Sequence, residues 1–191
     1  MILPMPDYTP QEAAAVSGVR LATVQKAITS RNIPARTDRR TRRRRLDVTA
    51  LLALALVRSL PEELRLTAKD AYRLLKQARD AGEFSTIAIG ELVRIDTGKA
   101  LAEVRRRMTL YEHARERIVS DPDIMGGTPT IRGTRITAHA VLGRLAAGDT
   151  IDSILEDYPY LDHETVEGAA VYAAANPPRG RPAGKPWRHA S

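Results

Sequence analysis

Apolar residues near the N-terminus repeat at helical spacing in two short segments that a glycine separates. Thr9 can cap a first helix, with Pro10 at its first position and Glu12 three residues after Thr9, as in a capping box. Residues 21–30 predict a second helix with Val24, Ala27 and Ile28 at core spacing. Gly18 suits a left-handed turn between them. Two short helices joined by such a turn are typical of a helix-turn-helix.

A strongly basic segment follows the second helix. Residues 36–45 contain seven arginines in ten positions, and a Leu/Ala-rich helix is predicted near residues 49–57. A basic connection at this place favours a β-hairpin wing that grips phosphate groups, although an unstructured solvated segment or a localisation signal remains the alternative. The side chains predicted to contact DNA are Arg20, Thr23, Gln25, Lys26, Arg31, Arg36, Arg39, Arg40, Arg42, Arg43, Arg44 and Arg45.

This N-terminal segment resembles the winged helix-turn-helix of the MerR-like excisionase and regulator group. The resemblance rests on TPQEAAAVSGV at the first helix and LDVTALL after the arginine run. It implies a DNA-binding domain over residues 1–58.

Residues 59–117 are predicted to form a helical and β connector. Thr67 can cap a helix that Gly82 ends, and TIAIGELVRID predicts two short strands around Gly90. A longer helix over residues 97–117 carries one narrow apolar stripe. Such a stripe suits packing on another helix, within the protein or across a dimer.

The segment IMGGTPTIRGTRI at 124–136 predicts a β-hairpin with Arg132-Gly133 as its turn. We expect Arg132 or Arg135 to pair with Asp121 or Asp123. The glycine spacing does not match a phosphate-binding loop. Three capped helices are predicted next, over 138–147, 151–157 and 163–176. Their predicted core is Val141, Leu142, Leu145, Ile151, Ile154, Leu155, Val166, Ala170, Val171 and Ala174.

Charge divides the chain into basic ends and an acidic segment. The formal net charge of +7 combines +7 over residues 1–60, +2 over 61–117, −6 over 118–175 and +4 over 176–191. A clustered basic surface suits a polyanion. The acidic segment would be repelled by phosphate, so we expect it to serve dimerisation and a protein partner instead.

The chemistry-bearing residues argue against an enzyme. The chain has no cysteine, which excludes disulfides, Cys-ligated zinc and a Cys nucleophile. Its four histidines lack ligand spacing, and nothing places a nucleophile near a base, so we expect no catalytic residues, metal or cofactor. No apolar run reaches the ~18 residues of a membrane span, and the N-terminus does not resemble a signal peptide. We expect a cytoplasmic protein without a membrane partner.

Residues 118–176 resemble the predicted antitoxins of the domain-of-unknown-function 433 family. The resemblance rests on IVSDPDIMGGTPTIRGTRITA, AAGDTIDSILEDYPYL and ETVEGAAVYAAAN. It implies a small hairpin followed by a three-helix, homeodomain-like bundle. It also implies the antitoxin of a VapB-like type II toxin–antitoxin pair, whose partner is a PIN-like ribonuclease toxin.

Residues 177–191 form a basic, Pro-rich tail. The VapB-like resemblance implies that such a tail can reach the acidic metal site of the toxin. The residues concerned are Arg179, Arg181, Lys185, Trp187 and Arg188.

Together these features predict a mainly α-helical chain with small β-hairpins, built from a winged helix-turn-helix and a C-terminal bundle. The predicted function is an antitoxin that neutralises its toxin and represses its own operon as a homodimer on operator DNA. A solvated terminus is the alternative for the tail, and a stand-alone MerR-like regulator without a toxin is the alternative for the whole chain.

Overall fold

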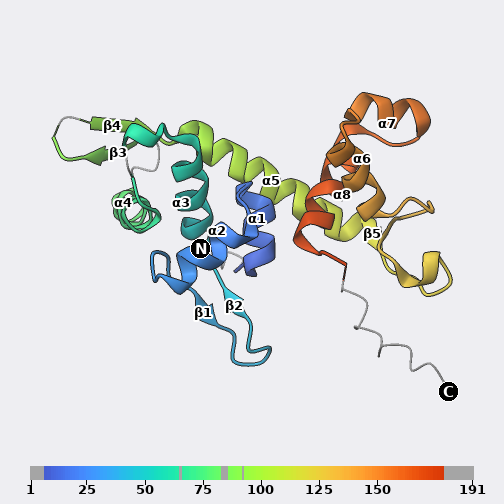
Figure 1. Ribbon diagram of the computed structural model, residues 1–191, viewed down its shortest axis with the longest axis horizontal. Coiled ribbons are helices and arrows are strands. Elements are labelled where there is room, and N and C mark those ends of the chain that lie inside the picture. Colours follow the sequence, from blue (N-terminus) through green and yellow to red (C-terminus); the bar gives the residue numbers. More distant parts are fainter. Residues whose placement is uncertain (1–6, 65, 83–85, 92, 179–191) are drawn as a thin grey trace, which may run out of the picture.

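The computed structural model describes residues 7–64, 66–82, 86–91 and 93–178 of the 191-residue chain. These residues form eight α-helices and three two-stranded antiparallel sheets (Figure 1). A mainly helical class with small hairpins is therefore confirmed. The tail residues predicted to bind a toxin, Arg179, Arg181, Lys185, Trp187 and Arg188, lie outside the described residues.

The elements follow one another in this order. The helices are α1 (Pro10–Ser17), α2 (Leu21–Thr29), α3 (Val48–Ser59), α4 (Ala68–Asp80), α5 (Gly98–Arg117), α6 (Ala138–Ala147), α7 (Ile151–Asp157) and α8 (His163–Ala175). The paired strands are β1 (Arg36–Thr37) with β2 (Arg44–Arg45), β3 (Thr86–Ile89) with β4 (Val93–Asp96), and β5 (Ile118–Val119) with β6 (Thr130–Ile131). Short 3-10 turns lie at Glu62–Leu64 and Met125–Gly127.

The first two helices form as their sequence predicts. The backbone N–H of Glu12 donates to Thr9 Oγ1 at 3.3 Å, and the backbone N–H of Thr9 donates to Glu12 Oε2 at 2.6 Å, which completes the capping box. Gly18 ends α1 with a φ of 71°, a left-handed conformation that glycine adopts without strain. Helix α2 then buries Val24, Ala27 and Ile28, as expected from their spacing.

One apolar cluster joins α1–α4, the β3–β4 hairpin and α5, and it also includes Val171 and Ala175 of α8. The short helix α1 lies against α2, α3, α5 and α8. Its buried side chains are small, chiefly Ala13, Ala14 and Ala15. Because alanine adds little bulk, several helices can approach this one closely.

A second cluster joins α6, α7 and α8 to the end of α5 through Ala114. In Figure 1, α5 runs from the N-terminal helices to this bundle, and α8 lies along its far end. Val141, Ile154 and Val166 are buried there, as predicted, while Leu155 is partly buried.

Two members of the predicted bundle core differ from their expected places. Ala174 is exposed, and its neighbours Ala173 and Ala175 are buried. Val171 is buried in the first cluster rather than the second. The reason is that α8 packs both on α6 and on α5 and α1, so its buried positions are set by two partners.

The segment at 124–136 forms its turn but pairs differently from the expected hairpin. Gly133 has a φ of 75°, and Thr130 bridges Thr137, as a tight turn requires. The ladder of β6, however, is made with β5, where Ile118 pairs with Ile131.

Because of this pairing, the two arginines of the segment have partners other than those expected. Arg132 lies beside the end of α5 and donates from Nη2 to the Glu116 carbonyl at 2.9 Å. Arg135 contacts Met125 Sδ at 3.9 Å. The Asp121 carboxylate instead accepts from the Asp123 N–H, so the expected arginine–aspartate pair is wrong.

Candidate nucleic-acid interface

Helix α2 presents a polar outer face. The buried side chains Val24, Ala27 and Ile28 define its inner side, because successive residues of an α-helix turn by about 100°. The exposed residues opposite them are Ala22, Thr23, Gln25, Lys26, Thr29 and Ser30. Thr23, Gln25 and Lys26 were predicted to contact DNA, whereas Ala22, Thr29 and Ser30 were not. These residues could have been predicted from the sequence, because they lie on the helix face opposite Val24, Ala27 and Ile28.

The β1–β2 hairpin projects away from the helices (Figure 1). Its tip is fixed by Asp38, whose Oδ1 accepts hydrogen bonds from the N–H of Thr41 at 2.6 Å, the Thr41 hydroxyl at 2.9 Å and the N–H of Arg40 at 3.0 Å. These bonds, with those from Thr41 first, hold the pKa of Asp38 below its usual value. One aspartate thus orders the turn while the arginine side chains stay in solvent.

The arginines of the hairpin are largely free of ion pairs. The exposed ones without an ion-pair partner among the described residues are Arg36, Arg39, Arg40, Arg42, Arg43 and Arg44, together with Arg20 and Arg31 on either side of α2. By contrast, Arg106 pairs with Glu167 at 2.7 Å and Arg144 with Asp157 at 2.7 Å. Positive charge is therefore concentrated and unneutralised beside the outer face of α2.

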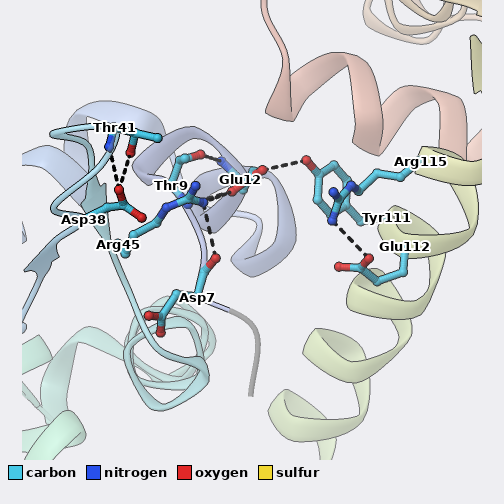
Figure 2. A network of polar contacts seen from close by, with 9 residues as sticks. All are labelled: Asp7, Thr9, Glu12, Asp38, Thr41, Arg45, Tyr111, Glu112 and Arg115. Carbon is cyan, nitrogen blue, oxygen red and sulfur yellow. Dashed lines mark hydrogen bonds and ion pairs between the residues drawn. The ribbon is translucent and has the colours of Figure 1, made fainter. Parts of the chain in front are cut away.

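Arg45 differs from its neighbours, because it is half-buried at the base of the hairpin. Its Nη1 lies 3.6 Å from Glu12 Oε2 and donates to the Asp7 carbonyl at 3.4 Å (Figure 2). The sequence grouped Arg45 with the DNA-contacting residues. In the structure the Arg45 guanidinium instead contacts groups of the protein itself. These contacts hold the base of the hairpin against α1.

The same carboxylate reaches the long helix α5. The Tyr111 hydroxyl donates to Glu12 Oε1 at 2.9 Å (Figure 2). Burial first, and then the charge of Glu12, raise the pKa of Tyr111 well above its usual value, so the hydroxyl stays a donor. The Tyr111 ring lies 6.3 Å from the ring of Tyr172 on α8. Polar and aromatic contacts therefore connect the hairpin base with α1, α5 and α8.

Each histidine in the described part of the chain contacts a different partner. His113 Nδ1 is 2.7 Å from Glu164 Oε1, His163 Nε2 is 3.1 Å from Asp152 Oδ1, and His139 Nε2 is 2.8 Å from the Asn176 carbonyl. His189 lies outside the described residues. Within the described ranges, no three His, Asp or Glu side chains gather as metal ligands would, and no helix has the length and apolar character to cross a membrane.

The C-terminal segment is similar to a known protein family. Residues 118–173 match the family described as "Protein of unknown function (DUF433)". The "Uncharacterized protein y4eO" of Sinorhizobium fredii (strain NBRC 101917 / NGR234) is 42% identical over 91 residues, which cover 48% of this chain and 41% of that protein. The chain thus spans less than half the length of this relative.

A solved structure also aligns with most of the chain. The X-ray crystal structure of Rv2018 from Mycobacterium tuberculosis is 17% identical, with a TM-score of 0.35, over 88% of this chain and 99% of that chain.

Proposed function

We propose that this chain is a DNA-binding antitoxin that neutralises a PIN-like ribonuclease toxin and represses its own operon. The observation that carries the DNA-binding part is the unpaired arginine cluster beside the exposed face of α2. In this proposal α2 enters the major groove and the β1–β2 hairpin acts as a wing on the phosphates, as in a winged helix-turn-helix. The protein acts in the cytoplasm as a homodimer on an inverted repeat.

The antitoxin part rests on the C-terminal segment. Residues 118–173 match the DUF433 family, and the antitoxin role is what the resemblance of the sequence motifs to that family implies. The basic tail supplies the proposed toxin contacts, Arg179, Arg181, Lys185, Trp187 and Arg188. An arginine placed among the metal-binding carboxylates of a nuclease would pair with them and displace the metal.

A stand-alone MerR-like regulator is the second candidate. Helix α8 of the bundle packs directly on α1, beside the helix proposed to read DNA. Such contact would let any ligand of the bundle influence DNA binding without a toxin.

DNA binding is tested by removing the free charge of the hairpin. Replacing Arg42, Arg43 and Arg44 with alanine should weaken binding to every sequence and reduce the salt slope by roughly one unit for each lost phosphate contact. Arg94→Ala is the matched control, because Arg94 is exposed on the distant strand β4 and has no ion-pair partner among the described residues. Equal salt slopes for the triple variant and this control would refute the proposed interface.

The antitoxin part is tested by coexpression with the protein encoded by a neighbouring open reading frame for a PIN-like nuclease. The full chain should suppress ribonuclease activity, and a chain truncated after Pro178 should suppress it less. Full suppression by the truncated chain would show that the tail is dispensable. The absence of any complex would favour the stand-alone regulator.

A further inference from the structure

A broad open cleft lies between the N-terminal helices and the C-terminal bundle. Its volume is about 1300 Å³. One wall comes from α1, α2 and β2, and the other from the 126–129 loop, α6 and the end of α8. Pockets for small molecules usually enclose roughly 300–1000 Å³, so a larger and more open cleft suits a polymer better.

The N-terminal wall carries polar and basic groups that belong to, or lie beside, the proposed DNA interface. Gln25 and Thr29 line the cleft from the outer face of α2, and Arg43 and Arg44 line it from the hairpin. Both arginines are exposed and lack an ion-pair partner in the described part of the chain. A duplex that meets α2 on this side would therefore pass next to the opposite wall.

The opposite wall is free of acids, although it belongs to an acidic segment. Residues 118–175 carry nine Asp and Glu against three arginines. None of these nine carboxylates is among the described residues that line the cleft. The acids instead lie elsewhere on the bundle, where Arg144 pairs with Asp157 and Arg117 Nη2 lies 3.9 Å from Glu164.

Glu12 is the one acid among the described residues that line the cleft. Its carboxylate is held by the Thr9 N–H, Tyr111 and Arg45. A polyanion in the cleft would therefore meet little uncompensated negative charge.

The acid-free wall also offers polar groups and accessible backbone. The hydroxyls of Ser120 and Thr128 have no hydrogen-bond partner in the described ranges, and both residues line the cleft. Between them, Gly126 carries no side chain, and a Cβ built on it meets nothing within 4 Å. Backbone, hydroxyl groups and His139 thus face the cleft together. Phosphate and sugar oxygens are commonly bound by such groups.

We propose that this cleft holds the sugar–phosphate backbone of the DNA that α2 reads, so that the DUF433-like bundle contacts the same duplex. The inference rests on the proposed DNA binding. It reverses the expectation that the net negative charge of the bundle keeps it away from DNA, because that charge lies off the cleft wall. An acidic protein segment is the competing occupant, and the test below separates the two.

The first experiment places a charge on the wall. Thr128→Asp and Thr128→Lys should shift affinity in opposite directions, each by about tenfold, for a 30-base-pair duplex from the promoter of the gene and for a random duplex. Ala146→Asp and Ala146→Lys are controls of equal net charge, since Ala146 is exposed on α6 and is not a lining residue. These controls should change affinity less than twofold.

A second experiment locates the DNA directly. Because the chain has no cysteine, Thr128→Cys provides a single site for an iron chelate that cleaves nearby DNA backbone. We expect cuts beside the sequence protected by α2, and none with the chelate on Ala146→Cys.

The outcomes separate the two proposals. If the unmodified protein binds neither duplex, the proposed function and this inference both fail. If alanine at Arg43 and Arg44 weakens binding while all Thr128 and Ala146 variants behave alike, the function stands and the inference is overturned. It is also overturned if polyglutamate binds more tightly than DNA and only its binding is lost in Thr128→Asp.

Discussion

At the scale of single residues, Glu12 connects parts of the chain that are far apart in sequence. Its carboxylate accepts from the Thr9 N–H and from Tyr111, and it lies beside Arg45 (Figure 2). One side chain therefore caps α1 and also ties the hairpin base to α5. The capping role was predicted from the Thr9–Glu12 spacing. The contacts with Arg45 and Tyr111 were not, because no local pattern reveals a partner 99 residues away.

Removing the Tyr111 hydroxyl should cost stability. Tyr111→Phe leaves the ring in place but takes a donor from a carboxylate, and hydrogen bonds to charged groups contribute about 1.5–3 kcal/mol. We expect a loss in that range, measured as the change in the free energy of unfolding by urea. An unchanged free energy would contradict the role assigned to this bond.

Tyr8→Phe is the matched control for this variant. The Tyr8 side chain is buried, and its hydroxyl has no hydrogen-bond partner among the described residues. At pH 7 its removal should therefore be neutral or stabilising. A loss above about 1 kcal/mol would show that the hydroxyl has a partner after all.

Alkaline titration gives the second prediction for Tyr8. Burial first, and then the charges of Glu112 and Glu12, raise its pKa from 10.0 to about 12. In the unfolded chain Tyr8 ionises near pH 10, so its ionisation costs the folded state nothing below pH 10 and lowers the free energy of unfolding as pH rises towards about 12. Tyr8→Phe lacks this decline. Urea midpoints between pH 9 and 12 should therefore fall less steeply for Tyr8→Phe than for the unchanged chain.

At the scale of elements, helices α8 and α5 approach each other closely at Gly168. A Cβ built on Gly168 would lie 3.3 Å from Ala114 Cβ and 3.3 Å from the Leu110 carbonyl oxygen. Gly168 is therefore needed because it lets α8 lie close to α5, and not because the backbone turns there. Gly143 on α6, by contrast, faces open space.

This contrast predicts opposite effects of one substitution. Gly168→Leu should destabilise the protein by about 1–3 kcal/mol, the usual cost of overpacking. Gly143→Leu should stabilise it by up to about 1 kcal/mol, since glycine is a poor helix residue. Thermal unfolding followed by circular dichroism measures both. If the two variants lose stability equally, the packing of α8 on α5 is not as described.

Capping residues and glycines in the sequence predicted where helices begin and end. They did not predict which elements and side chains contact one another. Thr137 and Thr150 cap α6 and α7, and Gly148 ends α6, so both helices appear at the predicted residues. The predicted pairing of Arg132 with an aspartate was wrong, because the β5–β6 ladder places it beside α5. The cleft was not foreseen either, since its two walls lie about a hundred residues apart in the sequence.

At the scale of the whole molecule, two apolar clusters share α5 and α8. Ala169 and Ala173 belong to the cluster of the bundle, while Val171 and Ala175 belong to the N-terminal cluster. Helix α8 is therefore buried on two sides by different partners. Unfolding of one cluster should therefore lower the stability of the other.

The shared helices predict how fragments behave. A fragment limited to the predicted C-terminal bundle, residues 118–176, lacks the α5 surface that Gly168 and Ala169 approach. We expect residues 98–178 to unfold cooperatively and residues 118–178 to be markedly less stable. Urea titration of both fragments measures this. Equal free energies of unfolding would show that α5 contributes nothing to the bundle.

The small side chains of α1 also limit how this protein can diverge by recombination. Ala13, Ala14 and Ala15 are buried on a helix that lies against α2, α3, α5 and α8. A different N-terminal unit joined to this bundle would bring its own first helix, and larger residues at these positions would hold the two halves apart. Exchange of the N-terminal unit should therefore succeed only between genes that already share an alanine-rich first helix. The N-terminal unit and the bundle are then inherited together.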